Sequence, residues 1–322
     1  MVKTLKSENG KYHCILGLSG GIDSSYMALW AYRNKINPLI VHMDNGWNSR
    51  ESVENIEIIC KTFGFELKTL VLPWDIFKKM QVAYLRAGII DLEVVTDHAI
   101  VATLRKISKE NNINYVLSGY NDATEMVLPT NWYFDAKDFA NIKDICAQYA
   151  EKINWAKYPK ITFKDLLMDK LKGKTMRFLA PLDLMDYNLV QVKKELVEAM
   201  PSYHVFPGKH NESLITRFYQ EYILRKKYGI EKRKAHLSNL ICSEQITKEE
   251  GLEILKTPYY SDNEIEDLKE FFIKKLDLTE SEFEDIMNAP ARKHEDFKSN
   301  QKNWQYYYAA NTTLKRLGMI KK

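Results

Sequence analysis

Short apolar runs alternate with longer segments of helical periodicity through the first half of the chain. The runs at 14–16, 38–43, 67–72 and 114–118 are short and largely apolar, as expected of strands buried in a parallel sheet. Between them, segments such as 49–63 carry apolar residues three and four positions apart, which predicts helices with one buried face. Strands that alternate with helices in this way predict right-handed crossovers, so we expect an α/β fold with a doubly wound parallel sheet.

The pattern changes in the second half of the chain, where helical spacing dominates. Residues 132–174 show only irregular helical spacing, which indicates a helical insertion near the ligand-binding edge of the sheet. Pro201 and Pro207 then mark a boundary. We therefore predict a sheet-containing domain over 1–200 and a helical C-terminal region over 201–322. Helices are expected in that region at 212–228, 234–241, 248–255, 264–276 and 301–317.

The composition is that of an ordinary globular protein. Of the 322 residues, 45% are hydrophobic and 28% are charged, which suffices for a core and argues against disorder. The first dozen residues are polar, and no later segment approaches the roughly 18 uninterrupted apolar residues that a membrane span needs. We therefore expect a cytoplasmic protein without a membrane span. The cysteines lie far apart, which predicts neither a disulfide framework nor a structural zinc site.

The net charge of +4 is small but unevenly distributed. Residues 209–236 contain eight lysines and arginines against three glutamates, so the rest of the chain is close to neutral. This local excess predicts an anionic partner at the segment. It is too confined for an extended track of nucleic-acid phosphates, and we therefore expect no nucleic-acid partner.

A glycine- and serine-rich loop at 18–25 joins the first predicted strand to the first predicted helix. Its glycines permit a tight turn and close backbone approach, and the amides at a helix start attract anions. Asp23 would repel a phosphate in such a loop unless it also held Mg²⁺, whose charge offsets both anions. We predict a pyrophosphate-binding loop with these members: Ser19, Gly20, Gly21, Asp23, Ser24 and Ser25.

Polar turns also follow the second and fourth predicted strands. Asp44 and Asn45 follow the second, and Ser118 and Gly119 follow the fourth. Because open α/β sheets bind ligands at the carboxyl ends of their strands, these turns and the glycine-rich loop outline a nucleotide cleft. We expect Asp44 and Asn45 to face the adenosine of a nucleotide and Ser118 and Gly119 to close the opposite wall. The alternative for Asp44 and Asn45 is an ordinary strand-end turn.

The Ser-Gly-Gly-x-Asp-Ser sequence at 19–24 resembles the signature of the PP-loop ATP pyrophosphatases. Enzymes of that superfamily cleave ATP between its α and β phosphates and adenylate an oxygen atom. The sequence differs from a Walker loop, which would end in Gly-Lys-Ser/Thr. The resemblance implies ATP and Mg²⁺ as cofactors and places Ser19 and Asp23 in the catalytic centre.

The chain also resembles the N-acetyl sugar amidotransferase family, bacterial enzymes of surface polysaccharide (lipopolysaccharide O-antigen) and flagellar glycan biosynthesis. The likeness rests on segments from both halves of the chain: 41–48, 96–99, 117–121, 208–213, 216–220, 227–238 and 241–247. Members of this family usually begin with a cysteine-rich, metal-binding segment. The chain starts just before the first predicted strand, so either this member lacks that segment or the segment has been removed, and we expect no structural zinc.

The resemblance implies a reaction and its partners. The acetamido group of a nucleotide-activated N-acetyl sugar becomes an acetamidino group, with ammonia supplied by a separate glutaminase. No Cys-His-Glu arrangement for glutamine hydrolysis is recognisable in the sequence, which agrees with a separate ammonia source. A homodimer is compatible with the sequence.

Basic residues in the C-terminal region are candidates for holding the sugar nucleotide. Lys209, His210, Arg217 and Arg233 suit a diphosphate or a uronate carboxylate, and Glu212 is expected to orient one of them. The alternative is that the basic residues of this segment form a solvated helix face.

Two further residues are candidates for proton transfer or metal binding. His98 could face the cleft and take a proton from incoming ammonia, although the preceding Thr96 and Asp97 are sufficient for a helix cap. Glu125 is an alternative base or Mg²⁺ ligand.

Two other functions compete with the amidotransferase. A tRNA-modifying PP-loop enzyme would use the basic segment at 209–236 for nucleic acid, although no cysteine pair is present to carry sulfur. A nucleotide-binding scaffold would keep the fold without turnover, against which the intact signature at 19–24 argues.

Overall fold

A computed structural model describes residues 1–8 and 10–316 of the chain. A five-stranded sheet forms its centre, with all strands parallel in the order β3-β2-β1-β4-β5. The strands are β1 (Cys14–Gly17), β2 (Pro38–Asp44), β3 (Leu67–Val71), β4 (Tyr115–Leu117) and β5 (Arg177–Leu179). Leu16 of β1 pairs with Ile40 on one side and with Leu117 on the other. The predicted α/β fold with a doubly wound parallel sheet is confirmed.

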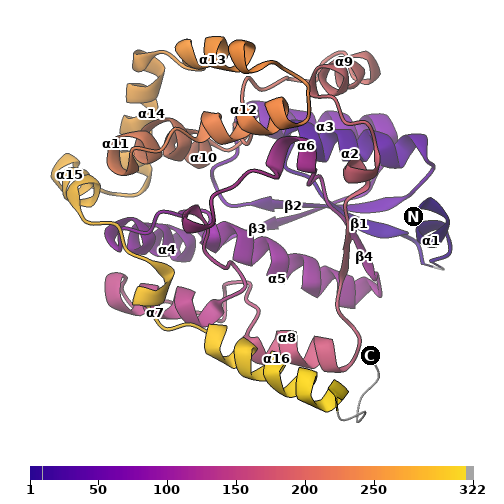
Figure 1. Cartoon of the computed structure of the whole chain (residues 1–322), viewed down its shortest axis with the longest axis horizontal. Helices are drawn as coiled ribbons and strands as arrows, with labels where there is room; N and C mark the ends of the chain where they lie inside the picture. Colours follow the sequence, from indigo (N-terminus) through magenta and orange to yellow (C-terminus); the bar gives the residue numbers. More distant parts are fainter. Residues whose placement is uncertain (9, 317–322) are drawn as a thin grey trace.

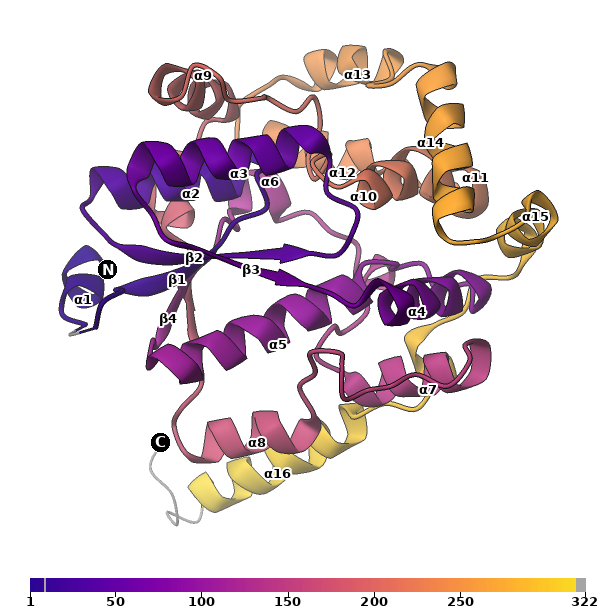
Figure 2. The same cartoon turned by 180° about the vertical axis from the view of Figure 1, so that it is seen from behind.

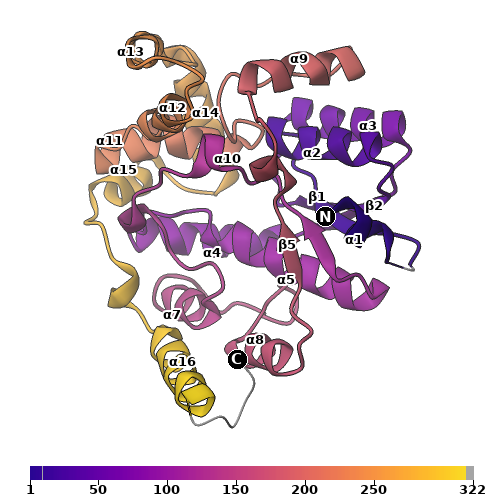
Figure 3. The ribbon, with the colours of Figure 1, turned by 45° about the vertical axis from the view of Figure 1, so that its right-hand side comes forward.

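Helices cover both faces of the sheet (Figures 1 and 2). One face carries α2, α3 and α9; the other carries α4 and α5, with α7, α8 and α16 outside them. Figure 3 shows β5 along one side of the sheet and α8 and α16 beyond α5. The bounds are α1 (Val2–Lys6), α2 (Ile22–Arg33), α3 (Arg50–Phe63), α4 (Trp74–Arg86), α5 (Val94–Asn111), α6 (Asp122–Glu125), α7 (Phe139–Tyr149), α8 (Phe163–Leu171), α9 (Leu189–Ala199) and α16 (Gln301–Arg316).

Beyond α9, the regular elements of the described chain up to residue 316 are helices joined by turns and loops. The predicted helix at 212–228 begins at residue 214 and contains a π-helical turn between two short α-helices. The helices are α10 (Leu214–Phe218), η3 (Tyr219–Ile223), α11 (Leu224–Tyr228), α12 (Lys232–Cys242), α13 (Lys248–Lys256), α14 (Asp262–Lys275) and α15 (Glu280–Asn288). Short 3₁₀ turns are η1 (Thr130–Trp132), η2 (Pro181–Leu184) and η4 (His294–Asp296). Residue 317, the last of the predicted helix at 301–317, lies outside the described residues.

Two large apolar clusters form most of the core. One joins β1, α2, α3 and α9 and includes Leu16, Met27 and Leu196. The other joins α4, α5 and α7 to α10, α14 and α15, so it contains residues from both sides of position 200. The division into domains 1–200 and 201–322, with an insertion at 132–174, therefore stays a prediction.

None of the helices in the described part of the chain is both long enough and apolar enough to cross a membrane.

A substitution of Phe272 on α14 tests how much the packing of the C-terminal helices contributes to stability. Its ring is fully buried and lies 4.7 Å from that of Phe218 and 5.6 Å from that of Trp47, measured between centroids. We expect Phe272→Ala to lower the free energy of unfolding by about 3–5 kcal/mol, because it leaves a cavity in a packed cluster. Urea denaturation measures this. The control Leu252→Ala, at a side chain that is 54% exposed, should change stability by less than about 0.5 kcal/mol; equal losses would contradict the packing described.

Candidate active site

Two loops meet at the carboxyl edge of the sheet. Because β1 and β4 are neighbours and the strands that follow them, β2 and β5, lie toward opposite edges of the sheet, a crevice opens between their ends. A Cβ on Gly119 would lie 3.0 Å from the Ser24 amide nitrogen and 3.1 Å from the Asp23 carbonyl carbon. At Gly20, φ is +81° and a Cβ would lie 2.4 Å from the Ser52 carbonyl oxygen. The loop after β4 can approach the start of α2, and the loop after β1 can approach α3, only because glycine occupies these positions.

The loop between β1 and α2 is folded around its own hydroxyl groups. Ser19 Oγ accepts a hydrogen bond from the Gly21 amide at 3.3 Å, and Ser24 and Ser25 donate to the Gly21 carbonyl at 3.2 and 2.6 Å. Among the described residues, no side chain caps the N-terminus of α2. The amides at the helix start are therefore available to an anion.

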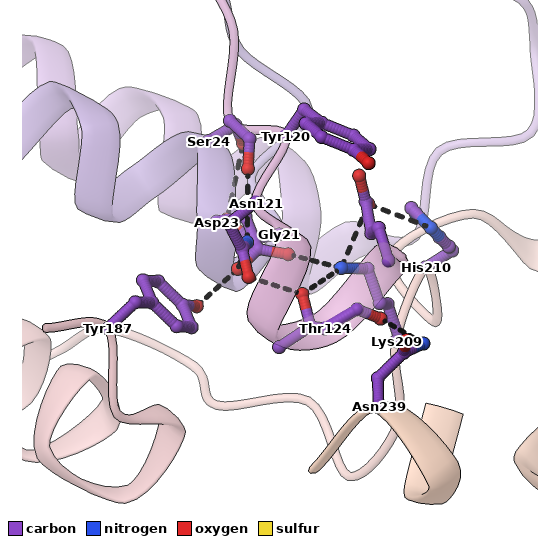
Figure 4. A network of polar contacts seen from close by, with 12 residues as sticks. Gly21, Asp23, Ser24, Tyr120, Asn121, Thr124, Tyr187, Lys209, His210 and Asn239 are labelled. Carbon is purple, nitrogen blue, oxygen red and sulfur yellow. Dashed lines mark hydrogen bonds and ion pairs between the residues drawn. The ribbon is translucent and has the colours of Figure 1, made fainter. Parts of the chain in front are cut away.

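The Lys209 ammonium group lies between two carboxylates (Figure 4). Its Nζ is 3.0 Å from Asp23 Oδ2 and 2.8 Å from Glu125 Oε1, and it donates to Thr124 Oγ1 at 2.5 Å. Burial raises the pKa of Glu125, while Lys209 acts in the opposite direction. A residue from the C-terminal region thus neutralises acidic groups from α2 and α6.

Asp23 has further donors on its other oxygen. The Tyr187 hydroxyl donates to Asp23 Oδ1, and Asn121 Nδ2 donates to the same atom at 3.3 Å. Burial and the charge of Asp23 raise the pKa of Tyr187, so it stays a donor. Tyr187 could not be recognised from the sequence, because a lone tyrosine after a 3₁₀ turn carries no motif.

The donor set around Asp23 and Glu125 bears on whether Mg²⁺ fits. In residues 1–8 and 10–316 no three acidic, histidine or cysteine side chains converge as a metal cage. Mg²⁺ usually binds through one or two carboxylates together with substrate phosphates and waters. Asp23 and Glu125 match that pattern, because they are two carboxylates that lie close together. The ammonium group of Lys209 already balances their charge. A metal ion bound to phosphates could balance the same two carboxylates.

Two cavities open beside the loop and share a wall. The first, which we call the loop cavity, measures about 200 Å³ and is lined by the start of α2, by Lys209 and by C-terminal residues including His236 and Tyr259. The second, the α5 cavity, measures about 300 Å³ and lies between the ends of β1 and β2, α5 and α10. The residues common to both cavities are Ser19, His210 and Glu212.

The α5 cavity is an apolar slot with a few polar groups. Its apolar walls include Leu18, Met43 and Ile100. Asp97 also lines it, and burial together with nearby acidic groups raises the pKa of this carboxyl well above its usual range. Thr103, 2% exposed, lines the same cavity, and its hydroxyl has no hydrogen-bond partner among the described residues. Such a site fits a flat, largely apolar ring with polar edges.

Glu212 is fixed in the shared wall by its backbone and its side chain. The Ser49 amide donates to the Glu212 carbonyl at 3.0 Å, and the Leu214 amide donates to the Trp47 carbonyl at 2.8 Å. Ser19 Oγ donates to Glu212 Oε1 at 2.9 Å. A Cβ on Gly21 would lie 2.6 Å from that oxygen, so the carboxylate sits directly against the loop.

Several predicted site residues line the cavities and others do not. Asn45 lines the α5 cavity and Gly119 lines the loop cavity. Asp44 instead accepts hydrogen bonds from the Gly46 amide at 2.8 Å and from Asn48 at 3.3 Å, as in the strand-end turn of the alternative interpretation. Ser118 Oγ accepts from the Tyr120 amide at 3.1 Å and likewise shapes its turn.

His98 lies away from both cavities, contrary to the prediction that it faces the cleft. It is 1% exposed, its Nδ1 is 2.6 Å from the Ala136 carbonyl oxygen, and its Nε2 accepts from the Ile161 amide at 3.1 Å. Burial lowers its pKa to about 4. Both ring nitrogens are thus occupied in holding the segment after α5, and the helix begins before Thr96, at Val94.

Arg217 and Arg233 also point away from the cavities. Arg233 is 3% exposed and donates to the Thr257 and Ile254 carbonyls, each at 3.0 Å. Arg217 donates to the Asn211 carbonyl at 2.7 Å and lines neither cavity. Both guanidinium groups bind backbone carbonyls and so join C-terminal segments. From the sequence alone, this structural role of an arginine cannot be distinguished from ligand binding.

Comparison with protein families divides the chain into two parts. Residues 1–158 match the NAD synthase family, and residues 212–311 match the family described as LPS biosynthesis protein WbpG-like, C-terminal domain. The first match includes the glycine- and serine-rich loop, so the N-terminal part of the chain is related to the ATP-utilising NAD synthetases. An NAD synthase-like part followed by a WbpG-like C-terminal part supports the resemblance to the N-acetyl sugar amidotransferases seen in the sequence.

Individual relatives match parts of the chain. A glutamine-dependent NAD(+) synthetase of Aquifex aeolicus is 32% identical over 157 residues, 45% of this chain and 27% of its own length. An uncharacterised protein of Methanocaldococcus jannaschii is 43% identical over 67 residues, 20% of this chain and 24% of its own. The matches thus span about a quarter of each of these relatives.

Two solved structures of differently named enzymes are similar to parts of the chain. An NH3-dependent NAD synthetase from Campylobacter jejuni superposes with a TM-score of 0.39 at 15% identity, covering 81% of this chain and 94% of its own. The U34-tRNA thiolase NcsA from Methanococcus maripaludis gives a TM-score of 0.36 at 16% identity, covering 76% and 77%.

Gly119→Ala tests the close approach of the two loops. The added methyl group would push the loop after β4 away from the start of α2, and we expect ATP affinity to fall about tenfold or more with the fold retained. Equilibrium binding of a non-hydrolysable ATP analogue measures this. Gly10→Ala is the matched control, because its Cβ would meet no atom closer than 3.4 Å; equal affinities for the two variants would contradict the geometry.

Proposed function

We propose that the protein is an ATP-dependent amidotransferase that converts the acetamido group of a nucleotide-activated N-acetyl sugar into an acetamidino group. The observation that carries the proposal is the pair of cavities that meet at the loop, both lined in part by the WbpG-like C-terminal part. Two cavities sharing one wall suit a reaction that joins two substrates through a covalent adenylate. The product would serve bacterial surface or flagellar glycan synthesis in the cytoplasm.

ATP would bind across the shared wall. The adenosine would occupy the α5 cavity, with its ring between the apolar walls and its polar edge toward Asn45, Asp97 and the free hydroxyl of Thr103. The pyrophosphate part would lie over the loop, where backbone amides and Ser24 can donate to it. Mg²⁺, held by Asp23 and Glu125 together with the phosphates, would offset negative charge on the leaving pyrophosphate.

The acceptor would enter through the loop cavity. Lys209, His210 and His236 line that cavity and can donate to the diphosphate or hydroxyl groups of a sugar nucleotide. Arg217 and Arg233 are left out of this role, because backbone carbonyls already occupy them.

The chemistry needs activation of a weak electrophile. An amide carbon resists attack because its oxygen is a poor leaving group. Attack of the acetamido oxygen on the α-phosphorus releases pyrophosphate and gives an O-adenylyl imidate. Ammonia from a separate glutaminase, or free ammonium in vitro, then adds to the imidate carbon and AMP departs. The protein supplies positioning and charge stabilisation, as in other phosphoryl transfers.

A panel of UDP- and CMP-linked N-acetyl sugars tests the proposed substrate class. With ATP, Mg²⁺ and ammonium, we expect one member of the panel to give pyrophosphate, AMP and a product about one mass unit lighter, because NH replaces O. Mass spectrometry and a pyrophosphate assay measure this. A salt-sensitive complex with tRNA and no response to any sugar nucleotide would favour a tRNA-modifying enzyme instead. Absence of pyrophosphate release under every condition would favour a nucleotide-binding scaffold.

Asp23→Asn tests the role of the loop carboxylate. The substitution keeps an oxygen for Tyr187 but removes the negative charge that faces Lys209, and we expect pyrophosphate release to fall about a hundredfold or more. The matched control is Asp75→Asn, at an exposed carboxylate in the first turn of α4. A near wild-type rate for Asp23→Asn, with both variants folded by circular dichroism, would remove Asp23 from the site.

A further inference from the structure

Glu212 lies where the two proposed substrates would meet. It lines both cavities, whereas Asp23 and Glu125 line only the loop cavity and Asp97 only the α5 cavity. If adenosine occupies one cavity and the sugar the other, the carbon that links them must lie near the shared wall. Glu212 is the acidic side chain of that wall, among the described residues that line the cavities.

The proposed reaction needs a base at this point. When ammonia adds to the imidate carbon, its nitrogen becomes a positively charged –NH₃⁺ group. While that nitrogen carries three protons it has no lone pair with which to expel AMP. If AMP left with the help of the sugar nitrogen alone, two positive charges would remain on one amidine group, so the forward reaction requires that one proton be removed. Once the nitrogen is neutral, its lone pair can form the C=N bond while the C–O bond breaks and AMP leaves with the electron pair.

We propose that Glu212 is the general base that takes this proton from the ammonia adduct, a role that rests on the proposed function. One proton moves from the –NH₃⁺ nitrogen to a carboxylate oxygen of Glu212 and then to water in the cavity. The acetamidinium product keeps its remaining protons, and AMP carries the oxygen of the former acetamido group. No oxidant, reductant or further co-reactant is needed.

The contacts of Glu212 suit a fixed base. Oε1 accepts from Ser19 at 2.9 Å, and backbone hydrogen bonds tie residues 212–214 to the turn after β2. Gly21 lacks the side chain that would collide with the carboxylate. These contacts hold the carboxylate in one place without neutralising it, since Ser19 is a neutral donor.

The charged neighbours of Glu212 set its proton affinity. Burial, Asp23 at the start of α2 and Glu93 before α5 all raise its pKa, while Ser19 lowers it. A carboxylate with a raised pKa is a stronger base than an exposed one. The base form exists only above that pKa, so the activity that depends on it should rise with pH.

Other candidates at the site are less suited to the role. Lys209 balances Asp23 and Glu125 directly. His210 shares the wall, but burial and the charge of Lys209 lower its pKa and weaken it as a base. His98 has both ring nitrogens occupied outside the cavities.

Glu212→Gln separates the two chemical steps. The amide keeps the size of the side chain and an oxygen for Ser19 but cannot accept the proton. With the sugar nucleotide that supports the wild-type reaction, we expect ATP–pyrophosphate exchange, which reports adenylation, to fall only several-fold. Amidine formation from ammonium should fall about 10²- to 10⁴-fold. At a fixed concentration of free ammonia, the variant should also lose the wild-type rise of rate with pH.

Hydroxylamine and two further variants complete the experiment. Hydroxylamine is less basic than ammonia, so its adduct loses a proton to water more readily, and it should restore turnover of Glu212→Gln more than that of wild type. Glu212→Asp should retain more amidine formation than Glu212→Gln. Glu221→Gln is the matched control, because Glu221 is a buried glutamate of the same helical region, 3.4 Å from Arg225, that lines neither cavity; both steps should be unaffected.

The outcomes distinguish the base from its alternatives. Equal losses of exchange and amidine formation would make Glu212 a residue that only positions the loop, and full retention of both would exclude it from the reaction. Either result overturns the inference while leaving the proposed function intact. If wild type shows no exchange with any acetamido sugar, the proposed function fails and the inference fails with it.

Discussion

One ammonium group, that of Lys209, balances the charge of the site and joins its separate segments. It contacts Asp23 of the loop and Glu125 of α6, although it comes from the C-terminal region. Without a cation at this point, the two carboxylates would repel each other where burial already raises the pKa of Glu125. A nucleotide would bring further negative charge to the same place, so its binding requires Lys209, a metal ion or both to balance the phosphates.

The same arrangement explains why the C-terminal helices matter to a site built on the sheet. Residues 212–214 hydrogen-bond to the turn after β2, and the buried Trp47 of that turn packs on α14 through Phe272. The indole Nε1–H donates to Gln81 of α4 at 2.8 Å, which fixes the turn from its other side. The C-terminal region therefore shapes the wall between the two cavities, and a different C-terminal region on the same loop would give that wall a different shape. This agrees with the separate family matches of the two parts of the chain.

The sequence predicted the sheet and its loop because both depend on local signals. Short apolar strands alternated with amphipathic helices, and a glycine-serine loop at a helix start has few other uses. The roles of polar residues were harder to predict, because the same side chain can bind either a ligand or a backbone carbonyl. His98, Arg217 and Arg233 satisfy backbone groups that only the folded chain brings near them.

Other contacts carried no sequence signal. Tyr187 donates a hydrogen bond to Asp23, which lies 164 residues away in the sequence. Asp97 was considered only as a helix-capping residue, but it lines the α5 cavity. Lys209 and Glu212 were recognised as site candidates because they lie in a polar segment of the sequence. The sequence did not show that Lys209 pairs with Asp23 or that Glu212 accepts a hydrogen bond from Ser19.

In the proposed reaction, the acetamido oxygen becomes bonded to the α-phosphorus of ATP. This step is tested most directly with a nucleotide-linked N-acetyl sugar whose acetamido oxygen is ¹⁸O, incubated with the enzyme, ATP, Mg²⁺ and ammonium. Mass spectrometry of the AMP should show one ¹⁸O atom per turnover and none in the pyrophosphate. Unlabelled AMP formed together with an amidine product, or ¹⁸O released as water, would contradict the account.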